Sequence, residues 1–227
     1  MNYGYKDDSG FPIKNYKDKI WEYSLGLYLN LLRGFDLSDM DVLEIGSGRG
    51  GGTDAIRRYL NPKSIIGIDL NENNVGLASN KFIEGQYQVG DATGLQFKDN
   101  SFDMVVNVES SHCYCDIDKF FKEVKRILKP MGLFLYTDFR NKDDVDSIKD
   151  SLNESGLKII KYEDITNNVV RSLSSDNERK DKLLDEITDD PIEKNIFAGL
   201  YAMKGTPMHR SFVYGDVIYY SMVMRNE

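Results

Sequence analysis

Short apolar runs alternate with stretches of helical periodicity through most of the chain, and this alternation restricts the fold more than any other feature of the sequence. The apolar runs that we predict to form strands cover residues 42–45, 64–69, 87–90, 102–108, 133–137 and 157–162. The helices expected between them cover about 50–60, a stretch from Asn73 onward, and 116–129. Strands that alternate with helices are joined by right-handed crossovers, which build a parallel sheet with helices on both faces. We therefore expect an α/β fold.

The two ends of the chain depart from this alternation. Apolar and aromatic side chains recur at helical spacing over residues 15–33, which predicts an amphipathic helix ahead of the first strand. Residues 167–200 are mostly polar and helical, and Tyr214–Met224 is a run of aromatic and β-branched residues typical of a strand. A helical insert beside a ligand crevice often forms a lid, although it can equally be packing material at the edge of a sheet.

Charge and composition exclude several classes of protein. Lysine and arginine number 29 against 37 aspartate and glutamate residues, and the net charge of −8 disfavours a nucleic-acid partner. No run approaches the roughly 20 apolar residues of a membrane span, and the first residues carry no export signal, so we expect a cytoplasmic protein without stable membrane anchoring. Cys113 and Cys115 have a spacing that suits neither a disulfide nor a zinc pair, and we expect both to be reduced and buried. No cluster of histidine and carboxylate residues has metal-ligand spacing, which predicts a metal-independent protein.

The strongest chemical signal is a glycine-rich turn after the first predicted strand, Val42-Leu-Glu-Ile-Gly-Ser-Gly-Arg-Gly50. Glycines at this point let the backbone approach a ligand closely, and the free N–H groups at the start of the next helix face that ligand. Acidic residues lie at the ends of three successive strands, namely Glu44, Asp69 and Asp91. Glu44 suits a cationic ligand better than a pyrophosphate, and Asp69 is placed to accept hydrogen bonds from ribose hydroxyls. Each acid alone could be a helix N-cap, but three in phase with the strands define one crevice along the carboxyl edge of the sheet.

In the order and spacing of these motifs the sequence resembles the class I S-adenosylmethionine-dependent methyltransferases, from about Asp41 to Met224. The resemblance implies a Rossmann-like sheet of seven strands that is mostly parallel, with an antiparallel last strand. It also implies that the glycine turn wraps the methionine part of S-adenosyl-L-methionine, that the acid after the second strand binds the ribose, and that the acid after the third binds the adenine. The residues to which cofactor binding is assigned in this way are Glu44, Gly46, Ser47, Gly48, Gly50, Asp69, Leu70, Asp91, Ala92, Asn107 and Tyr16.

The resemblance further divides a single domain into four segments. They are a helical cover over the cofactor at 1–40, a cofactor-binding core at 41–165, a helical insert or lid at 166–205, and the last strand at 206–227. The first segment is crowded with aromatic residues, which are Tyr3, Tyr5, Phe11, Tyr16, Trp21 and Tyr23. An aromatic ring near a sulfonium can stabilise it by a cation–π interaction. Tyr3 and Tyr16 are the expected contacts, whereas Trp21 and Tyr28 are expected in the core.

The end of the fourth predicted strand carries the candidate for catalysis, in Asn107-Val-Glu-Ser-Ser-His-Cys-Tyr114. Imidazole has a pKa suited to removing a proton from an attacking hydroxyl. The segment resembles the Glu-Ser-x-His-His motif of O-methyltransferases that tailor sugars, polyketides and glycolipids. In those relatives the first histidine is the proposed base and an aspartate after strand five assists it, roles that fall on His112 and Asp138, while Cys113 replaces the second histidine. The alternatives are that His112 orders the loop and the cofactor, that Asp138 caps the next helix, and that Glu109 is a structural acid rather than a cofactor contact.

These observations predict methyl transfer from S-adenosyl-L-methionine to a small, partly apolar acceptor, with a hydroxyl oxygen as the favoured acceptor atom and His112 as the general base. Methylation of nitrogen or carbon on a small metabolite is the first alternative. The second is a cofactor-bound scaffold, or a catalyst of a rearrangement such as a cyclisation. The other histidine, His209, is expected at the surface or in a hydrogen-bonded turn. The expected partner is thus a small molecule, and a homodimer is left open.

Overall fold

The computed structural model describes residues 2–8, 13 and 16–227, with the side chains of residues 16 and 17 outside that description. The strands are β1 (Asp41–Ile45), β2 (Ser64–Asp69), β3 (Gln86–Val89), β4 (Phe102–Val108), β5 (Leu128–Asn141), β6 (Leu157–Asp164) and β7 (Val217–Asn226). The α-helices are α1 (Glu22–Leu31), α2 (Gly51–Leu60), α3 (Glu72–Lys81), α4 (Ile117–Ile127), α5 (Val145–Glu154), α6 (Thr166–Ile187), α7 (Pro191–Leu200) and α8 (Pro207–Tyr214). Short 3₁₀ helices are η1 (Tyr16–Trp21), η2 (Ser111–Cys113) and η3 (Lys142–Asp144).

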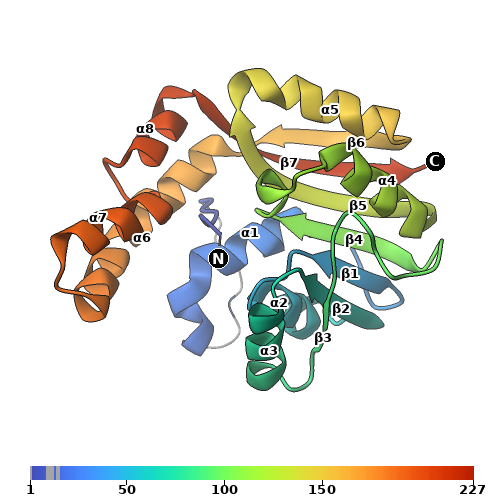
Figure 1. Ribbon diagram of the computed structural model, residues 1–227, viewed down its shortest axis with the longest axis horizontal. Coiled ribbons are helices and arrows are strands. Elements are labelled where there is room, and N and C mark those ends of the chain that lie inside the picture. Colours follow the sequence, from blue (N-terminus) through green and yellow to red (C-terminus); the bar gives the residue numbers. More distant parts are fainter. Residues whose placement is uncertain (1, 9–12, 14–15) are drawn as a thin grey trace.

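The described residues form a seven-stranded sheet with the strand order β3-β2-β1-β4-β5-β7-β6. Strands β1 to β5 pair with one another in parallel, whereas β7 is antiparallel to both β5 and β6. The predicted α/β fold with an antiparallel last strand is therefore confirmed (Figure 1). From β1 the chain first builds outward through β2 and β3 and then returns to add β4 on the other side. Open α/β sheets bind their ligands at such a reversal, beyond the carboxyl ends of the strands.

Successive residues of the inner strands point into two different apolar layers. Met104 and Val106 on β4 belong to a layer shared with α1, α2, α6 and α8, while Val105 belongs to a layer shared with α4 and α5. Helix α4 begins after Asp116, whose carboxylate accepts a hydrogen bond from the Lys119 N–H at 2.9 Å. Its buried face consists of Phe120, Phe121, Val124 and Ile127. Both faces of the sheet are covered, which leaves the strand ends as the place for a site (Figure 1).

The connection from β6 to β7 carries α6, α7 and α8 and projects from one side of the molecule (Figure 1). Pro191 stands in the first turn of α7, where its missing N–H leaves no helical hydrogen bond unmade. The predicted helical insert therefore consists of two helices, α6 and α7, with a break between them. Thr206 caps α8, and this helix ends at Gly215, which has a φ of +78°. The last strand therefore begins at Val217 rather than at Tyr214, because α8 occupies the first part of the segment 206–227.

The insert helices differ in how they pack. Helix α6 buries Val169 and Leu173 in the apolar layer of the sheet, whereas α7 has no buried residue. Ile192, Ile196 and Leu200 on α7 are 71%, 58% and 63% exposed. Within the described part of the chain, no helix combines the length and the apolar character that crossing a membrane requires.

Candidate active site

The glycine turn after β1 is held at the carboxyl edge of the sheet by backbone hydrogen bonds. The Gly46 N–H donates to the Ile68 carbonyl oxygen at 2.9 Å. The Gly48 N–H donates to Asp69 Oδ2 at 2.8 Å. Gly46, Gly48 and Gly50 have φ angles of +75°, +54° and +80°, which other residues rarely adopt. The three glycines therefore form a turn that ties the end of β1 to the end of β2.

A cavity of about 200 Å³ lies beside this turn. It is lined by Asn2, Tyr28, Gly46, Ser47, Gly48, Asp69, Val108, Glu109, Ser110 and Cys113. The charged members of this lining, Asp69 and Glu109, are both acidic. A Cβ built on Gly48 would meet no atom within 4 Å, and the buried Oγ of Ser47 has no hydrogen-bond partner among the described residues. The cavity thus offers space beside the backbone, and its acidic walls suit a ligand that carries positive charge.

Glu44 lies behind the turn and is absent from the described lining of the cavity. Its side chain is fully buried, and the Tyr28 hydroxyl donates to Oε1 at 2.7 Å while the Thr53 hydroxyl donates to the other oxygen. Burial raises the pKa of Glu44, and these two hydrogen bonds act against that rise. Glu44 thereby joins α1 to α2 next to the cavity, and a direct contact to a cofactor stays a prediction.

Other residues predicted to bind the cofactor lie along the same edge of the sheet, outside the described lining of the cavity. Asp91 is exposed, and its Oδ1 accepts hydrogen bonds from the N–H and the hydroxyl of Thr93, both at 2.8 Å, which lower its pKa. Leu70 is 72% exposed and Ala92 is buried. Asn107 is buried at the end of β4, where its Nδ2 donates to a carbonyl of β1 at 2.9 Å and its Oδ1 has no partner among the described residues. Their contacts with a cofactor also stay predictions.

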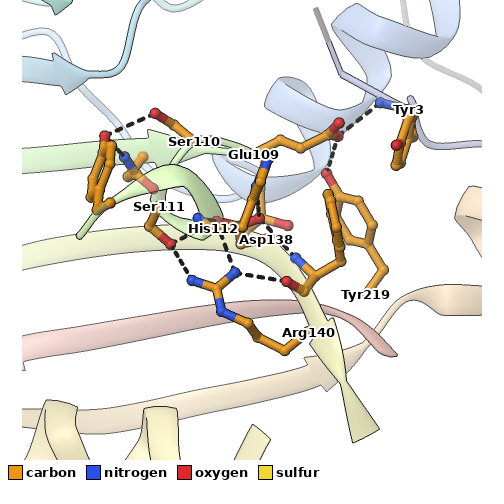
Figure 2. Close-up of polar contacts among 12 residues, drawn as sticks. Tyr3, Glu109, Ser110, Ser111, His112, Asp138, Arg140 and Tyr219 are labelled. Carbon is orange, nitrogen blue, oxygen red and sulfur yellow. Dashed lines mark hydrogen bonds and ion pairs between the residues drawn. The ribbon is translucent and has the colours of Figure 1, made fainter. Parts of the chain in front are cut away.

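His112 and Asp138 form a hydrogen-bonded pair beside the cavity. Asp138 is fully buried within β5, and its Oδ1 lies 2.8 Å from Nδ1 of His112 in η2 (Figure 2). Asp138 therefore does not cap a helix. The His112 side chain is 28% exposed, and its neighbours Ser110 and Cys113 line the cavity. Because Nδ1 faces the carboxylate, Nε2 is the ring nitrogen that points away from Asp138.

Asp138 is held by more than His112. The Ser111 hydroxyl donates to Asp138 Oδ2 at 2.6 Å, and the Arg140 guanidinium lies 3.3 Å from the same oxygen (Figure 2). Burial alone would raise the pKa of Asp138, but His112 and Arg140 lower it below its usual value. Burial alone would lower the pKa of His112, but the hydrogen bond and the charge of Asp138 raise it overall. Asp138 thus stays ionised, and the imidazole binds a proton more readily than it would in water.

Glu109, directly after β4, is the second acid of the cavity. Its φ of +47° is unusual for a residue other than glycine. Its Oε2 accepts hydrogen bonds from the Tyr3 N–H at 2.8 Å and from the Tyr219 hydroxyl at 2.7 Å (Figure 2). Burial raises the pKa of Glu109 to about 7. Burial therefore favours the protonated form of Glu109 at a point where the N-terminal segment and β7 meet.

Residues 2–8, which we call the strap, connect α1 to α6. The Tyr5 N–H donates to the Tyr23 carbonyl oxygen on α1 at 2.9 Å. The Lys6 N–H donates to the Asn168 carbonyl oxygen on α6 at 3.2 Å. Because Asn2 lines the cavity, the strap forms part of its wall. That residues 1–40 cover a cofactor stays a prediction.

Gly4 allows the strap to lie close to both helices. It has a φ of +80°, and a Cβ at this position would lie 2.4 Å from Ser172 Oγ and 2.8 Å from Tyr23 Cβ. We expect Gly4→Ala to destabilise the docked strap by about 1–3 kcal/mol, since the added carbon forces neighbouring atoms apart. Faster hydrogen exchange at the strap amides, followed by mass spectrometry, would report this loss. Gly34→Ala is the matched control, because Gly34 has a φ of +89° but no atom within 4 Å of its Cβ, and equal strap exchange in the two variants would contradict the argument.

Three sequence predictions about burial are wrong. Cys113 and Cys115 are exposed rather than buried, because η2 and the loop after it carry them along the edge of the sheet. Trp21 is 45% exposed instead of lying in the core, and its ring centre lies 5.5 Å from the Arg179 guanidinium. His209 is buried on α8, because this helix packs against α6 and β7.

Sequence reasoning missed Ser111, Arg140 and Tyr219 as members of the site. A signal existed for Arg140, since it follows Asp138 by two residues and alternate side chains of a strand share a face. Phe11 and the side chain of Tyr16 lie outside the described residues, so the predicted contact of Tyr16 with the cofactor stays a prediction. Over residues 2–8, 13 and 16–227, no group of three or more His, Cys, Asp and Glu side chains is arranged to hold a metal ion.

Known proteins resemble this chain in both sequence and fold. A family model described as a methyltransferase domain matches residues 43–136. The chain is 35% identical over 191 residues to the fatty-acid O-methyltransferase of Mycolicibacterium smegmatis, covering 82% of this chain and 69% of that protein. It is 30% identical over 224 residues to the phthiotriol/phenolphthiotriol dimycocerosates methyltransferase of Mycobacterium tuberculosis, covering 96% and 82% of the two chains. The solved structure of geranyl diphosphate C-methyltransferase from Streptomyces coelicolor, in complex with S-adenosyl-L-homocysteine, shares the fold with a TM-score of 0.71 at 14% identity, covering 100% and 93%.

Proposed function

The chain belongs to the class I S-adenosylmethionine-dependent methyltransferases, and on that premise we propose that it methylates a hydroxyl oxygen of a small, largely apolar molecule such as a lipid. The observation that carries this proposal is the His112–Asp138 pair beside the cavity. A hydroxyl is a weak nucleophile until a base removes its proton, whereas an ionised carboxylate needs no base. The name of the fatty-acid O-methyltransferase supports an oxygen acceptor and an apolar substrate.

The residues of the cavity fit S-adenosyl-L-methionine. Asp69 offers a carboxylate to ribose hydroxyls, and Gly48 leaves open space beside the backbone. The acidic walls match the positive charge of the cofactor. When bound, the cofactor supplies a methyl group carried on its sulfonium sulfur.

His112 is the proposed general base. Its Nε2 accepts the proton of the acceptor hydroxyl as the hydroxyl oxygen attacks, and Asp138 at Nδ1 stabilises the positive charge that develops on the imidazole. Ser111 and Arg140 keep Asp138 in place and ionised. The Phe139 ring, whose centre lies 4.5 Å from that of His112, restricts the rotation of the imidazole. These residues orient the imidazole and hold the proton that it accepts. Alignment of the sulfur, the methyl group and the acceptor oxygen supplies much of the rate.

Product analysis tests this function. The wild-type protein would be incubated with methyl-labelled S-adenosyl-L-methionine and with three acceptors that share one alkyl chain but end in a hydroxyl, a carboxyl or an amine. We expect the label in the methyl ether of the alcohol, identified by mass spectrometry. A labelled ester or N-methyl product without any ether would contradict the hydroxyl assignment. Conversion of an acceptor without transfer of the label would favour a rearrangement such as a cyclisation.

Asp69→Ala tests the placement of the ribose. We expect the dissociation constant for S-adenosyl-L-homocysteine to rise by the equivalent of ~1.5–3 kcal/mol, the usual worth of hydrogen bonds to a charged group. Titration calorimetry would measure the loss, and thermal unfolding would check the fold, because Asp69 also accepts the Gly48 N–H. A folded variant with an unchanged dissociation constant would remove Asp69 from the cofactor site.

A further inference from the structure

Glu109 is a cavity acid that the proposed base pair does not use. Its left-handed backbone conformation, with a φ of +47°, persists only where the surrounding structure enforces it, and such strain clusters at functional sites. Oε2 receives both hydrogen bonds, from the Tyr3 N–H and the Tyr219 hydroxyl. No hydrogen bond from a described residue reaches Oε1. Among the described residues, hydrogen bonds therefore engage Oε2 but not Oε1, and Glu109 lines the cavity.

We propose that Glu109 is the counter-charge by which this cavity distinguishes the sulfonium of S-adenosyl-L-methionine from the thioether of S-adenosyl-L-homocysteine. The inference rests on the proposed placement of the cofactor in the cavity. The two molecules share their adenosine, ammonium and carboxylate groups, and they differ in one methyl group and in the positive charge on sulfur. Because the described lining contains no basic side chain, the carboxylate of Glu109 favours the charged molecule over the neutral one.

The position of Glu109 assigns it to the sulfur rather than to the ribose. In methyl transfer the sulfur, the methyl group and the acceptor oxygen lie in line, and the acceptor hydroxyl must also reach His112. Glu109 lies three residues before His112, between β4 and η2, and its charge contributes to the raised pKa of His112. Asp69 ends β2, which lies on the other side of β1 from β4. Of the two cavity acids, Glu109 is thus the one beside the reacting atoms.

The protonation of Glu109 decides when its charge is present. Burial raises its pKa to about 7, and the charges around it also shift this value. The ionisable groups of the described elements that interact with it are Tyr3 of the strap, Tyr28 of α1, His112 of η2, Asp138 of β5, Lys180 of α6 and Tyr219 of β7. The charge of the N-terminal amine also acts to lower its pKa. A nearby sulfonium lowers the pKa of Glu109, so binding of S-adenosyl-L-methionine releases a proton from Glu109 to the solvent. The preference for the sulfonium therefore rises with pH until Glu109 is ionised without a ligand, and then levels off.

Glu109→Gln tests the proposal, because glutamine keeps an oxygen that accepts from Tyr3 and Tyr219 but removes the charge. We expect the affinity for S-adenosyl-L-methionine to fall about tenfold, equivalent to one unit of pKa shift, the low end of what a close opposite charge produces. The affinity for S-adenosyl-L-homocysteine should stay close to that of the wild type. Calorimetry of the wild type in two buffers of different ionisation enthalpy should also report proton release near pH 7 with the sulfonium ligand and none with the thioether.

Asp69→Asn is the matched control. It neutralises the other cavity carboxylate, which faces a ribose that both ligands share, so it should weaken both by the same factor. Equal losses for the two ligands in Glu109→Gln, or no loss for either, would overturn the inference. If the variant does not fold, the absence of proton release in the wild type would overturn it instead. A wild-type protein that binds neither ligand would reject the proposed function, and the inference with it.

Discussion

Replacing His112 with alanine should lower turnover ~10²–10⁴-fold, the usual loss when a general base is removed. Affinity for S-adenosyl-L-homocysteine should hardly change, because the proposed role of His112 is proton transfer and not cofactor binding. Steady-state rates at saturating cofactor, together with calorimetry, would separate the two quantities. Cys115→Ala is the control, since Cys115 is exposed in the loop that follows η2 and has no role in the mechanism.

The dependence of the rate on pH gives the same hypothesis a second signature. The wild-type rate should fall as the pH drops through the pKa of His112, because a protonated imidazole cannot accept the hydroxyl proton. Asp138 raises that pKa above 6.5, so the decline should begin at a higher pH than the value for free imidazole would give. His112→Ala should lack this limb. Near-normal turnover in the variant, or a loss of cofactor affinity as large as the loss of turnover, would contradict a catalytic base.

Replacing Gly52 with alanine should destabilise the protein by about 2–4 kcal/mol, through overpacking and the loss of a buried hydrogen bond. A Cβ at this position would lie 2.2 Å from the Tyr28 ring and 2.4 Å from Glu44 Oε1. Tyr28 must then move, and the buried carboxylate of Glu44 loses the hydroxyl that donates to it at 2.7 Å. The free energy of unfolding, measured in urea, would report the change.

Gly51→Ala is the matched control for this variant. Gly51 also lies in the first turn of α2, but a Cβ there would meet no atom within 4 Å. Alanine at an open helical position is neutral or stabilises by up to about 1 kcal/mol. Similar stabilities for the two variants would show that Glu44 and Tyr28 do not depend on the space that Gly52 leaves.

The parts of the site that could be predicted lie close to signals in the local sequence. The period of apolar residues marks the strands, and parallel strands bring their carboxyl ends to one edge, so the glycine turn and Asp69 could be placed together. His112 and Asp138 follow the same logic, because β4 and β5 are parallel neighbours. The hydrogen bond between them joins the two residues that the resemblance pairs as base and assisting aspartate.

The contacts of Glu109 could not be predicted in this way. The Tyr3 N–H and the Tyr219 hydroxyl that meet on its carboxylate come from residues 106 and 110 positions away. Tyr219 lies at the site because β7 pairs antiparallel with β5, and the register of this pairing depends on the whole sheet. The cysteines and Trp21 fail for a related reason, since residue type predicts average burial, whereas the position of a loop or a short helix decides burial in one protein.

The absence of any buried residue in α7 bears on how a protein of this kind can change over evolutionary time. Substitutions at exposed positions alter folding free energy by only a few tenths of a kcal/mol, about ±0.5, so genetic drift can proceed there with little penalty. Asp138, by contrast, is fully buried between strands and tied to three other side chains, so almost any replacement would disturb them. Helix α7 can therefore accumulate neutral substitutions, and selection can act on these to form new recognition surfaces while the residues around Asp138 stay unchanged.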